Sequence, residues 1–226
     1  MDRSFRSFLL AATLTAATCA SAQPLNGTYT VGTAGTYTTL AAAITALQTN
    51  GVSGPVTMDI ISGTYTGNWT INAIAGTSAV NTVTFRSQAL LNTAVVLTFT
   101  NAGSPVVTYN GCAFVTFRHV TITGSLAGVR YSTNPADCAV RDCIVSVSSA
   151  FGAAIASSTS QADRARVENN TITSPFLGIY FSSPVGQWDD DLVLRGNTIA
   201  TTAQTAIVSQ NGDNITICLL YTSRCV

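Results

Sequence analysis

The chain has 226 residues, of which only 9% are charged, and its ten basic and ten acidic residues give a formal net charge of zero. Every basic residue is an arginine. So neutral a chain argues against nucleic acid or an acidic membrane surface as the partner. The length is sufficient for one domain with a sizeable core.

Residues 1–22 have the pattern of a cleavable signal peptide. Arg3 and Arg6 precede an apolar run over residues 8–17, and small residues lead to a cleavage point after Ala22. The apolar run is shorter than the roughly 20 residues that a membrane-spanning helix needs. We therefore expect a secreted or cell-surface protein without a membrane span.

Residues 23–51 predict an N-terminal strand followed by an amphipathic helix. Leu40, Ile44 and Leu47 are spaced so that they share one helix face, and Gly51 follows as a stop signal. A stack of parallel strands has an apolar end that must be covered. We expect this helix to cap such a stack.

Residues 52–217 predict the coils of a parallel β-helix. Four stretches align without gaps, and they begin 23, 27 and 27 residues apart along the chain. Each is followed at a nearly constant offset by a second short strand, which suggests two strands per coil of a solenoid. The aligned stretches are Phe117–Ile122, Val140–Val145, Val167–Ile172 and Leu194–Ile199.

The alignment also predicts which side chains stack from coil to coil. Side chains alternate along a strand, and equivalent residues of neighbouring coils lie about 4.8 Å apart. We therefore expect Val140, Val167 and Leu194 to form one row inside the coils. Asn170 and Asn197 should form a ladder of side-chain amides. On the outer face, Glu168 should lie in a column between Arg141 and Arg195.

The chain resembles the right-handed parallel β-helix proteins that Bacteroidetes export to the cell surface. The likeness runs from about residue 25 to 217 and includes the segments Gly27–Gly32, Asn50–Val56, Ser62–Thr66 and Asn169–Ile172. It implies an all-β, right-handed, single-stranded parallel β-helix with an adhesin-like role. Such proteins often carry a C-terminal sorting domain. None is present here, so we expect the chain to be a fragment that lacks further C-terminal domains.

Residues 218–226 do not continue the repeat. Asn214–Ile217 read as the start of another coil, which Cys218–Ser223 interrupt. That six-residue segment matches one reading frame of a sequencing-adapter end, which predicts a non-native tail. A native apolar strand is the alternative.

The cysteines outside the predicted signal peptide and tail leave two interpretations open. Cys112 and Cys138 would lie on neighbouring coils, and in an exported protein they could form a disulfide. Alternatively, they and Cys143 are small buried hydrophobic residues. The single histidine has no cysteine pair at zinc-binding spacing beside it, so we expect no zinc site.

The one acidic cluster, Asp189, Asp190 and Asp191, is the only credible catalytic centre. Together with Arg195 it would serve a polysaccharide lyase or glycoside hydrolase acting on an acidic polysaccharide. Asp189 and Asp191 are also candidate calcium ligands, the only cofactor that the sequence suggests. Consecutive strand residues diverge, however, so a solvated loop is the alternative.

Three further residues are candidates for ligand binding. Trp188 could stack on a sugar, and Arg166 and Glu168 belong to an outward charged cluster. The alternatives are packing for the tryptophan and an ion-paired column for the charges. The leading hypothesis is an exported, non-catalytic module that binds extracellular glycans or a cell surface, or has a structural role.

Overall fold

The computed structural model describes residues 23–101, 103–201, 205–218 and 221–223. The predicted signal peptide lies outside these residues, as do parts of the predicted tail. Within the described ranges, no helix is both long and apolar enough to cross a membrane.

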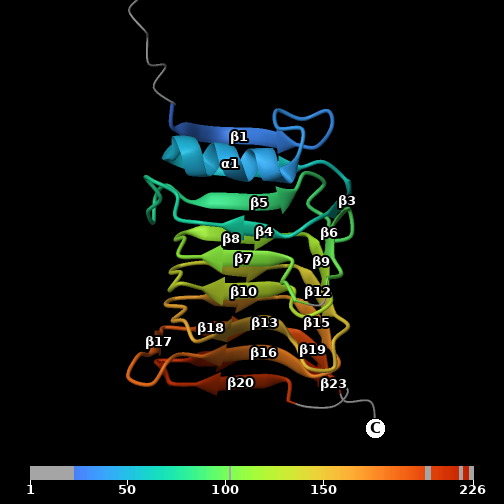
Figure 1. Cartoon of the computed structure of the whole chain (residues 1–226), viewed down its shortest axis with the longest axis vertical. Helices are drawn as coiled ribbons and strands as arrows, with labels where there is room; N and C mark the ends of the chain where they lie inside the picture. The colour runs from blue at the N-terminus through green and yellow to red at the C-terminus, as the bar shows by residue number, and fades with distance from the viewer. Residues whose placement is uncertain (1–22, 102, 202–204, 219–220, 224–226) are drawn as a thin grey trace, which may run out of the picture.

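The chain forms a right-handed parallel β-helix of about seven turns, and its three sheets run along the solenoid (Figure 1). Sheet A contains β1 (Leu25–Val31), β2 (Val52–Ile60), β5 (Val83–Ser87), β8 (Val115–Arg118), β11 (Ala139–Arg141), β14 (Arg166–Glu168), β18 (Val193–Arg195) and β22 (Thr216–Cys218). Sheet B contains β3 (Gly63–Thr66), β6 (Val95–Phe99), β9 (Thr121–Gly124), β12 (Ile144–Val147), β15 (Thr171–Ser174), β19 (Thr198–Thr201) and β23 (Tyr221–Ser223). Sheet C contains β4 (Trp69–Ile71), β7 (Val107–Asn110), β10 (Val129–Ser132), β13 (Ala153–Ser158), β16 (Leu177–Ser182) and β20 (Ile207–Gln210). The short strands β17 (Asp189–Asp190) and β21 (Gly212–Asp213) pair beside them.

Each regular coil has three strands, so the prediction of two strands per coil was wrong. The aligned stretches are not continuous, because the third residue of each adopts a left-handed conformation and turns the chain from sheet A into sheet B. The residues at this corner are His119 (φ 52°), Asp142 (φ 53°), Asn169 (φ 57°) and Gly196 (φ 66°). Asn, Asp, His and Gly tolerate positive φ better than other residues do.

The interior row contains the side chains that the repeat places in register. Val140 on β11 pairs with Val167 on β14, which pairs with Leu194 on β18, and all three are fully buried. Phe117 continues the row on β8. Each fully buried aliphatic side chain contributes roughly 1.5–3 kcal/mol, so this row stabilises the stack strongly.

An asparagine ladder lies next to that row, at the corner between sheets A and B. The Asn170 side-chain amide donates to Asn197 Oδ1 at 3.0 Å and to the Val140 carbonyl at 2.9 Å, and its own Oδ1 accepts from Cys143 N at 2.9 Å. Asn197 repeats the pattern by donating to the Val167 carbonyl at 2.7 Å. Both amides are buried, so these bonds offset the cost of taking polar groups out of water.

The helix α1 (Leu40–Asn50) packs on the N-terminal coil beside β1 (Figure 1). Its buried face contains Leu40, Ile44 and Leu47, and the Thr39 hydroxyl accepts from Ala42 N at its start. Gly51 ends it at φ 68°, where an added Cβ would lie 2.7 Å from the Ala75 carbonyl oxygen. The helix therefore occupies the capping position that its amphipathic pattern predicts.

Cys112 and Cys138 lie on neighbouring coils, as their spacing predicts. Their sulfur atoms are 3.6 Å apart as thiols, and both side chains are buried. At the other end of the chain, β22 ends at Cys218, the first residue of the segment predicted as a non-native tail, and β23 lies wholly within that segment; the two strands pair with β18 and β19.

Candidate functional site

Sheet C has a hollow of about 200 Å³ on its outer face. Its floor contains the small residue Ala156, which stands in register between Arg130 on β10 and Tyr180 on β16. Two rung spacings separate these larger side chains, which is roughly 9.6 Å. The register therefore leaves a slot above the alanine methyl, with a guanidinium on one side and a phenol ring on the other.

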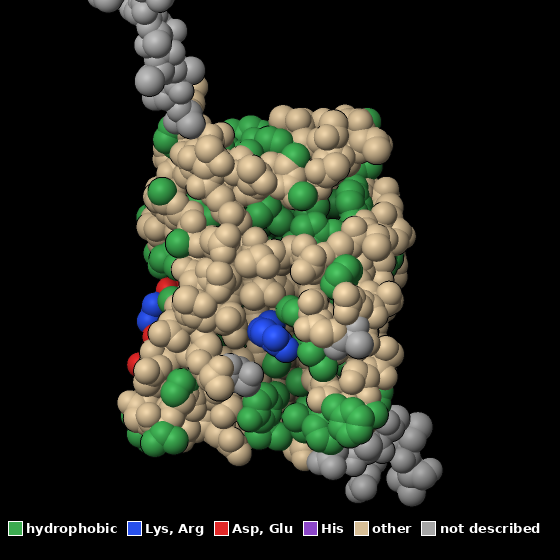
Figure 2. Space-filling view, in the orientation of Figure 1, with side chains coloured by type: hydrophobic (Ala, Val, Ile, Leu, Met, Phe, Trp, Pro, Cys, Tyr) green, Lys and Arg blue, Asp and Glu red, His purple; other side chains and the backbone are tan. Residues whose placement is uncertain are grey.

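Exposed aromatic and aliphatic side chains border this slot. Phe151, at 85% exposure, packs against Phe176 with ring centroids 6.4 Å apart, and Leu177 lines the hollow beside Tyr180. Figure 2 shows this face of the molecule as mostly uncharged, with one small basic patch near its middle next to hydrophobic side chains. An aromatic surface open to water is suited to packing against the apolar face of a ring-shaped ligand.

Arg130 is one of two arginines in the described part of the chain for which no ion pair is found, the other being Arg166. Its Nε is buried and has no hydrogen-bond partner. A guanidinium presents several donors in a planar fork that matches a carboxylate. The hollow on sheet C therefore combines a ring-packing surface with a cation that no anion of the described residues neutralises.

The hollow contains groups that can bind an acidic ring-shaped ligand. Among the described residues that line it, none is an aspartate, glutamate or histidine. Most glycoside hydrolases use a pair of carboxyl groups. This site therefore has the groups to hold an acidic sugar but lacks that pair.

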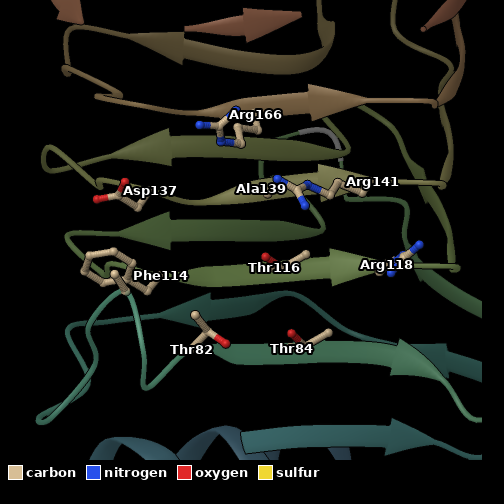
Figure 3. Close-up of a pocket in the computed structure, with 10 residues that line it drawn as sticks. Thr82, Thr84, Phe114, Thr116, Arg118, Asp137, Ala139, Arg141 and Arg166 are labelled. Atoms are coloured by element: carbon tan, nitrogen blue, oxygen red, sulfur yellow. The ribbon is translucent and has the colours of Figure 1, made fainter. Parts of the chain in front are cut away.

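A second groove, of about 370 Å³, crosses the outer face of sheet A (Figure 3). Thr84, Thr116, Ala139 and Arg166 stand in one register column on β5, β8, β11 and β14. Arg118, Arg141, Phe114 and Asp137 line the same groove on either side of that column.

Ion pairs bind most of the charges on sheet A to one another. Glu168 accepts from Arg141 at 2.8 Å and from Arg195 at 2.7 Å, so the predicted alternating column is present. Glu168 lies on the outer face between these arginines, but it is only 4% exposed because the two arginines cover it.

The structure separates the three aspartates of the predicted catalytic centre. Asp189 is fully buried and accepts from the Ser183 hydroxyl at 2.8 Å and from Ala162 N at 2.7 Å. Asp190 and Asp191 are exposed, and Asp191 accepts from the Asn214 side chain. Within the residues described, no group of three potential ligands that could hold a metal ion is found.

The environment of Asp189 is different from the solvated loop considered as the alternative. Burial raises the pKa of the Asp189 carboxyl above its ordinary value, although the hydrogen bonds from Ser183 and Ala162 oppose that rise. One carboxyl oxygen, Oδ2, has no partner. Asp189 therefore lies inside the coil, where it cannot share a ligand at the surface with its two exposed neighbours.

The other predicted ligand-binding residues are not gathered at one site. Trp188 is 52% exposed, and its main-chain carbonyl accepts from the Gln161 side chain at 3.0 Å. Trp188 and Arg195 line neither of the two grooves, whereas Arg166 lines the groove on sheet A.

Sequence reasoning missed Arg130, Tyr180 and Phe151. The strand segments containing Arg130 and Tyr180 are visible in the repeat, but the connection before each of them varies in length. Ala156 lies 26 residues after Arg130 and Tyr180 lies 24 after Ala156, whereas the aligned stretches are 23 and 27 residues apart, so the repeat alone does not place the three residues in one column. Phe151 lies in a turn between strands, where the repeat gives no signal.

Comparisons with known proteins are consistent with this architecture. Residues 65–220 match the family described as "Right handed beta helix region". Among solved structures, the pectin methylesterase from Aspergillus niger has a TM-score of 0.53 at 13% identity, with 90% of this chain and 83% of that chain covered. The pectin methylesterase from carrot has a TM-score of 0.50 at 14% identity, with 78% of this chain and 63% of that one covered. At these identities the likeness shows the fold alone. No curated protein matches the chain.

Proposed function

Because the chain belongs to the right-handed β-helix family, we propose that it is an exported module that binds an acidic polysaccharide through the hollow on sheet C. One observation carries the proposal: Arg130, which has no ion pair, faces Tyr180 across Ala156 in a slot with an aromatic rim. A uronate sugar fits this combination, because it has an apolar ring face and a carboxylate.

The predicted signal peptide and the resemblance to exported Bacteroidetes proteins support a location outside the cell. The two pectin methylesterases are named for an activity on pectin, which makes polygalacturonate a reasonable first probe.

The observations favour binding over a lyase or hydrolase reaction. Asp189 is buried inside the coil, whereas Asp190, Asp191 and Arg195 are exposed, so these residues lack a common face for a substrate. No carboxyl group lines the hollow that we assign to the ligand, as far as the described residues extend.

The test is titration calorimetry of the purified chain with oligogalacturonate and with the same oligomers reduced to neutral sugars. We expect binding to the acidic form, and Arg130→Gln should weaken it by about tenfold or more, as losing a charge-assisted hydrogen bond implies. Tyr180→Ala should weaken both ring packing and affinity. Arg166→Gln is the matched control, because it removes the other unpaired arginine from a different face.

The proposal would fail if Arg130→Gln bound the acidic oligomer as tightly as the unmodified protein. Equal affinity for the acidic and neutral oligomers would also contradict it. Release of unsaturated or reducing sugars during the titration would point to catalysis instead.

A further inference from the structure

The groove on sheet A has a separate chemical character from the hollow on sheet C. Most of its cations are already paired: Arg118 binds Asp142 at 2.7 Å, and Arg141 binds Glu168 at 2.8 Å. Asp137, the acid in the groove, is held by two bonds from Arg164 at 2.8 and 2.7 Å. Arg166 is exposed and has no such partner.

The register places the small residue Ala139 at the floor of the groove next to Arg166, where larger neighbours leave it only 3% exposed. Ala139 stands one rung before it in the same column, and Thr116 stands one rung further. Arg141 follows two residues after Ala139 on β11, so it lies diagonally from Arg166 at roughly 8 Å between main chains. Figure 3 shows Arg166 and Arg141 on either side of the Ala139 position.

The two guanidinium groups therefore border one space from different directions, and no carboxylate of the described chain pairs with Arg166. Glu168 neutralises Arg141, so Arg166 provides the uncompensated positive charge of the groove. An anion above Ala139 would pair with Arg166 and accept a further hydrogen bond from Arg141, and the Thr116 hydroxyl is available on the far side.

We propose that this groove binds a tetrahedral oxyanion, specifically a sulfate ester carried by a polysaccharide. Donors that approach from several directions suit four tetrahedral oxygens, whereas a single fork such as Arg130 suits a planar carboxylate. Thr82, Thr84 and Thr116 extend the groove away from the arginines, and their hydroxyls match those of a sugar chain. This site is independent of the function proposed for sheet C, because it uses another face and other residues.

Dextran sulfate and unmodified dextran are the probes, used with the full chain in a surface-binding assay. We expect binding to dextran sulfate only, and Arg166→Gln should lower its affinity by about tenfold or more, as expected for a lost charge-assisted contact. The matched control is Arg195→Gln, on the same face but outside the groove, which should change the affinity less than about twofold.

A second variant tests the space itself. Ala139→Leu leaves every charge in place but fills the position between Thr116 and Arg166, so it should also abolish binding of dextran sulfate. Far-ultraviolet circular dichroism would verify that the variant is folded, and binding of oligogalacturonate on sheet C would serve as a second check. Arg130→Gln should leave dextran sulfate binding unchanged, which keeps this outcome distinct from that of the sheet C proposal.

Three outcomes would overturn the inference. Equal losses of affinity from Arg166→Gln and Arg195→Gln would indicate that dextran sulfate is attracted only by the positive charge of the face as a whole. Full binding by a folded Ala139→Leu variant would place the anion elsewhere. Tighter binding to phosphorylated dextran than to dextran sulfate would contradict the assignment to a sulfate ester.

Discussion

Leu194 and Arg195 are neighbours on β18, but they belong to different parts of the solenoid. Leu194 lies in the interior row and pairs with Val167, whereas Arg195 lies on the outer face and pairs with Glu168. Inside, each rung places an apolar side chain on the next one. Outside, the three sheets differ: sheet A has ion pairs, sheet C has a hollow, and the described outward residues of sheet B are mainly threonines and uncharged.

This difference separates what maintains the fold from what selects a ligand. Interior positions accept only side chains that fill the coil, so they repeat. Outer positions face water and have no such packing constraint. We therefore expect substitutions inside to change stability, and substitutions outside to change binding with little change in stability.

The largest expected effect is that of Leu194→Ala. This change removes a fully buried side chain from the interior row, and it should lower the free energy of unfolding by about 2–5 kcal/mol, as large-to-small core changes do. Urea denaturation followed by circular dichroism would measure it. A loss smaller than that caused by Arg195→Ala would contradict the division between inside and outside.

Cys112 and Cys138 allow the interior to be strengthened. We expect oxidised glutathione to convert their thiols to a disulfide while two glutathione thiols are released, because the sulfur atoms must close by only part of their 3.6 Å separation to reach about 2.05 Å. The cross-link should add about 2–4 kcal/mol to the free energy of unfolding.

The reaction should be slow in the folded protein. The hydrogen bond to Cys138 and burial raise the pKa of the Cys112 thiol, so little of the reactive thiolate forms near neutral pH. Mass spectrometry after alkylation would follow the bond, and Cys112→Ser is the control. Complete alkylation of both cysteines after refolding with oxidised glutathione would contradict the prediction.

Most of the fold followed from the sequence, because the interior must repeat. The alignment of Val140, Val167 and Leu194 identified the coils, and the spacing of Leu40, Ile44 and Leu47 identified the helix. The third strand of each coil was missed, since the left-handed corner at Asn169 or Gly196 interrupts a stretch that reads as continuous.

The candidate sites followed less well, because they depend on residues from separate strands. Arg130, Ala156 and Tyr180 form a slot only after the coils are in register. Three consecutive aspartates suggested a catalytic or calcium site. The burial of Asp189 depends on its partners Ser183 and Ala162, which the local sequence does not reveal.

A change in the asparagine ladder should have an intermediate effect. Asn170→Ala removes the acceptor of Cys143 N and the donor to the Val140 carbonyl, leaving buried polar groups without partners. We expect a loss of about 1–3 kcal/mol in the free energy of unfolding. The exposed neighbour Asn169→Gly is the matched control, because glycine accepts its positive φ; an equal loss there would argue against a special role for the ladder.

The smallest effect is expected from Arg195→Ala on the outer face. Its side chain is 54% exposed and shares Glu168 with Arg141, so one ion pair remains after the substitution. Because Arg195 is half exposed and Glu168 keeps its pair with Arg141, we expect a loss of no more than about 1 kcal/mol, which added salt reduces further. Urea denaturation at low and high salt would therefore give a small difference that shrinks as salt is added. A loss as large as that of Leu194→Ala would mean that the charged column maintains the fold as strongly as the interior row does.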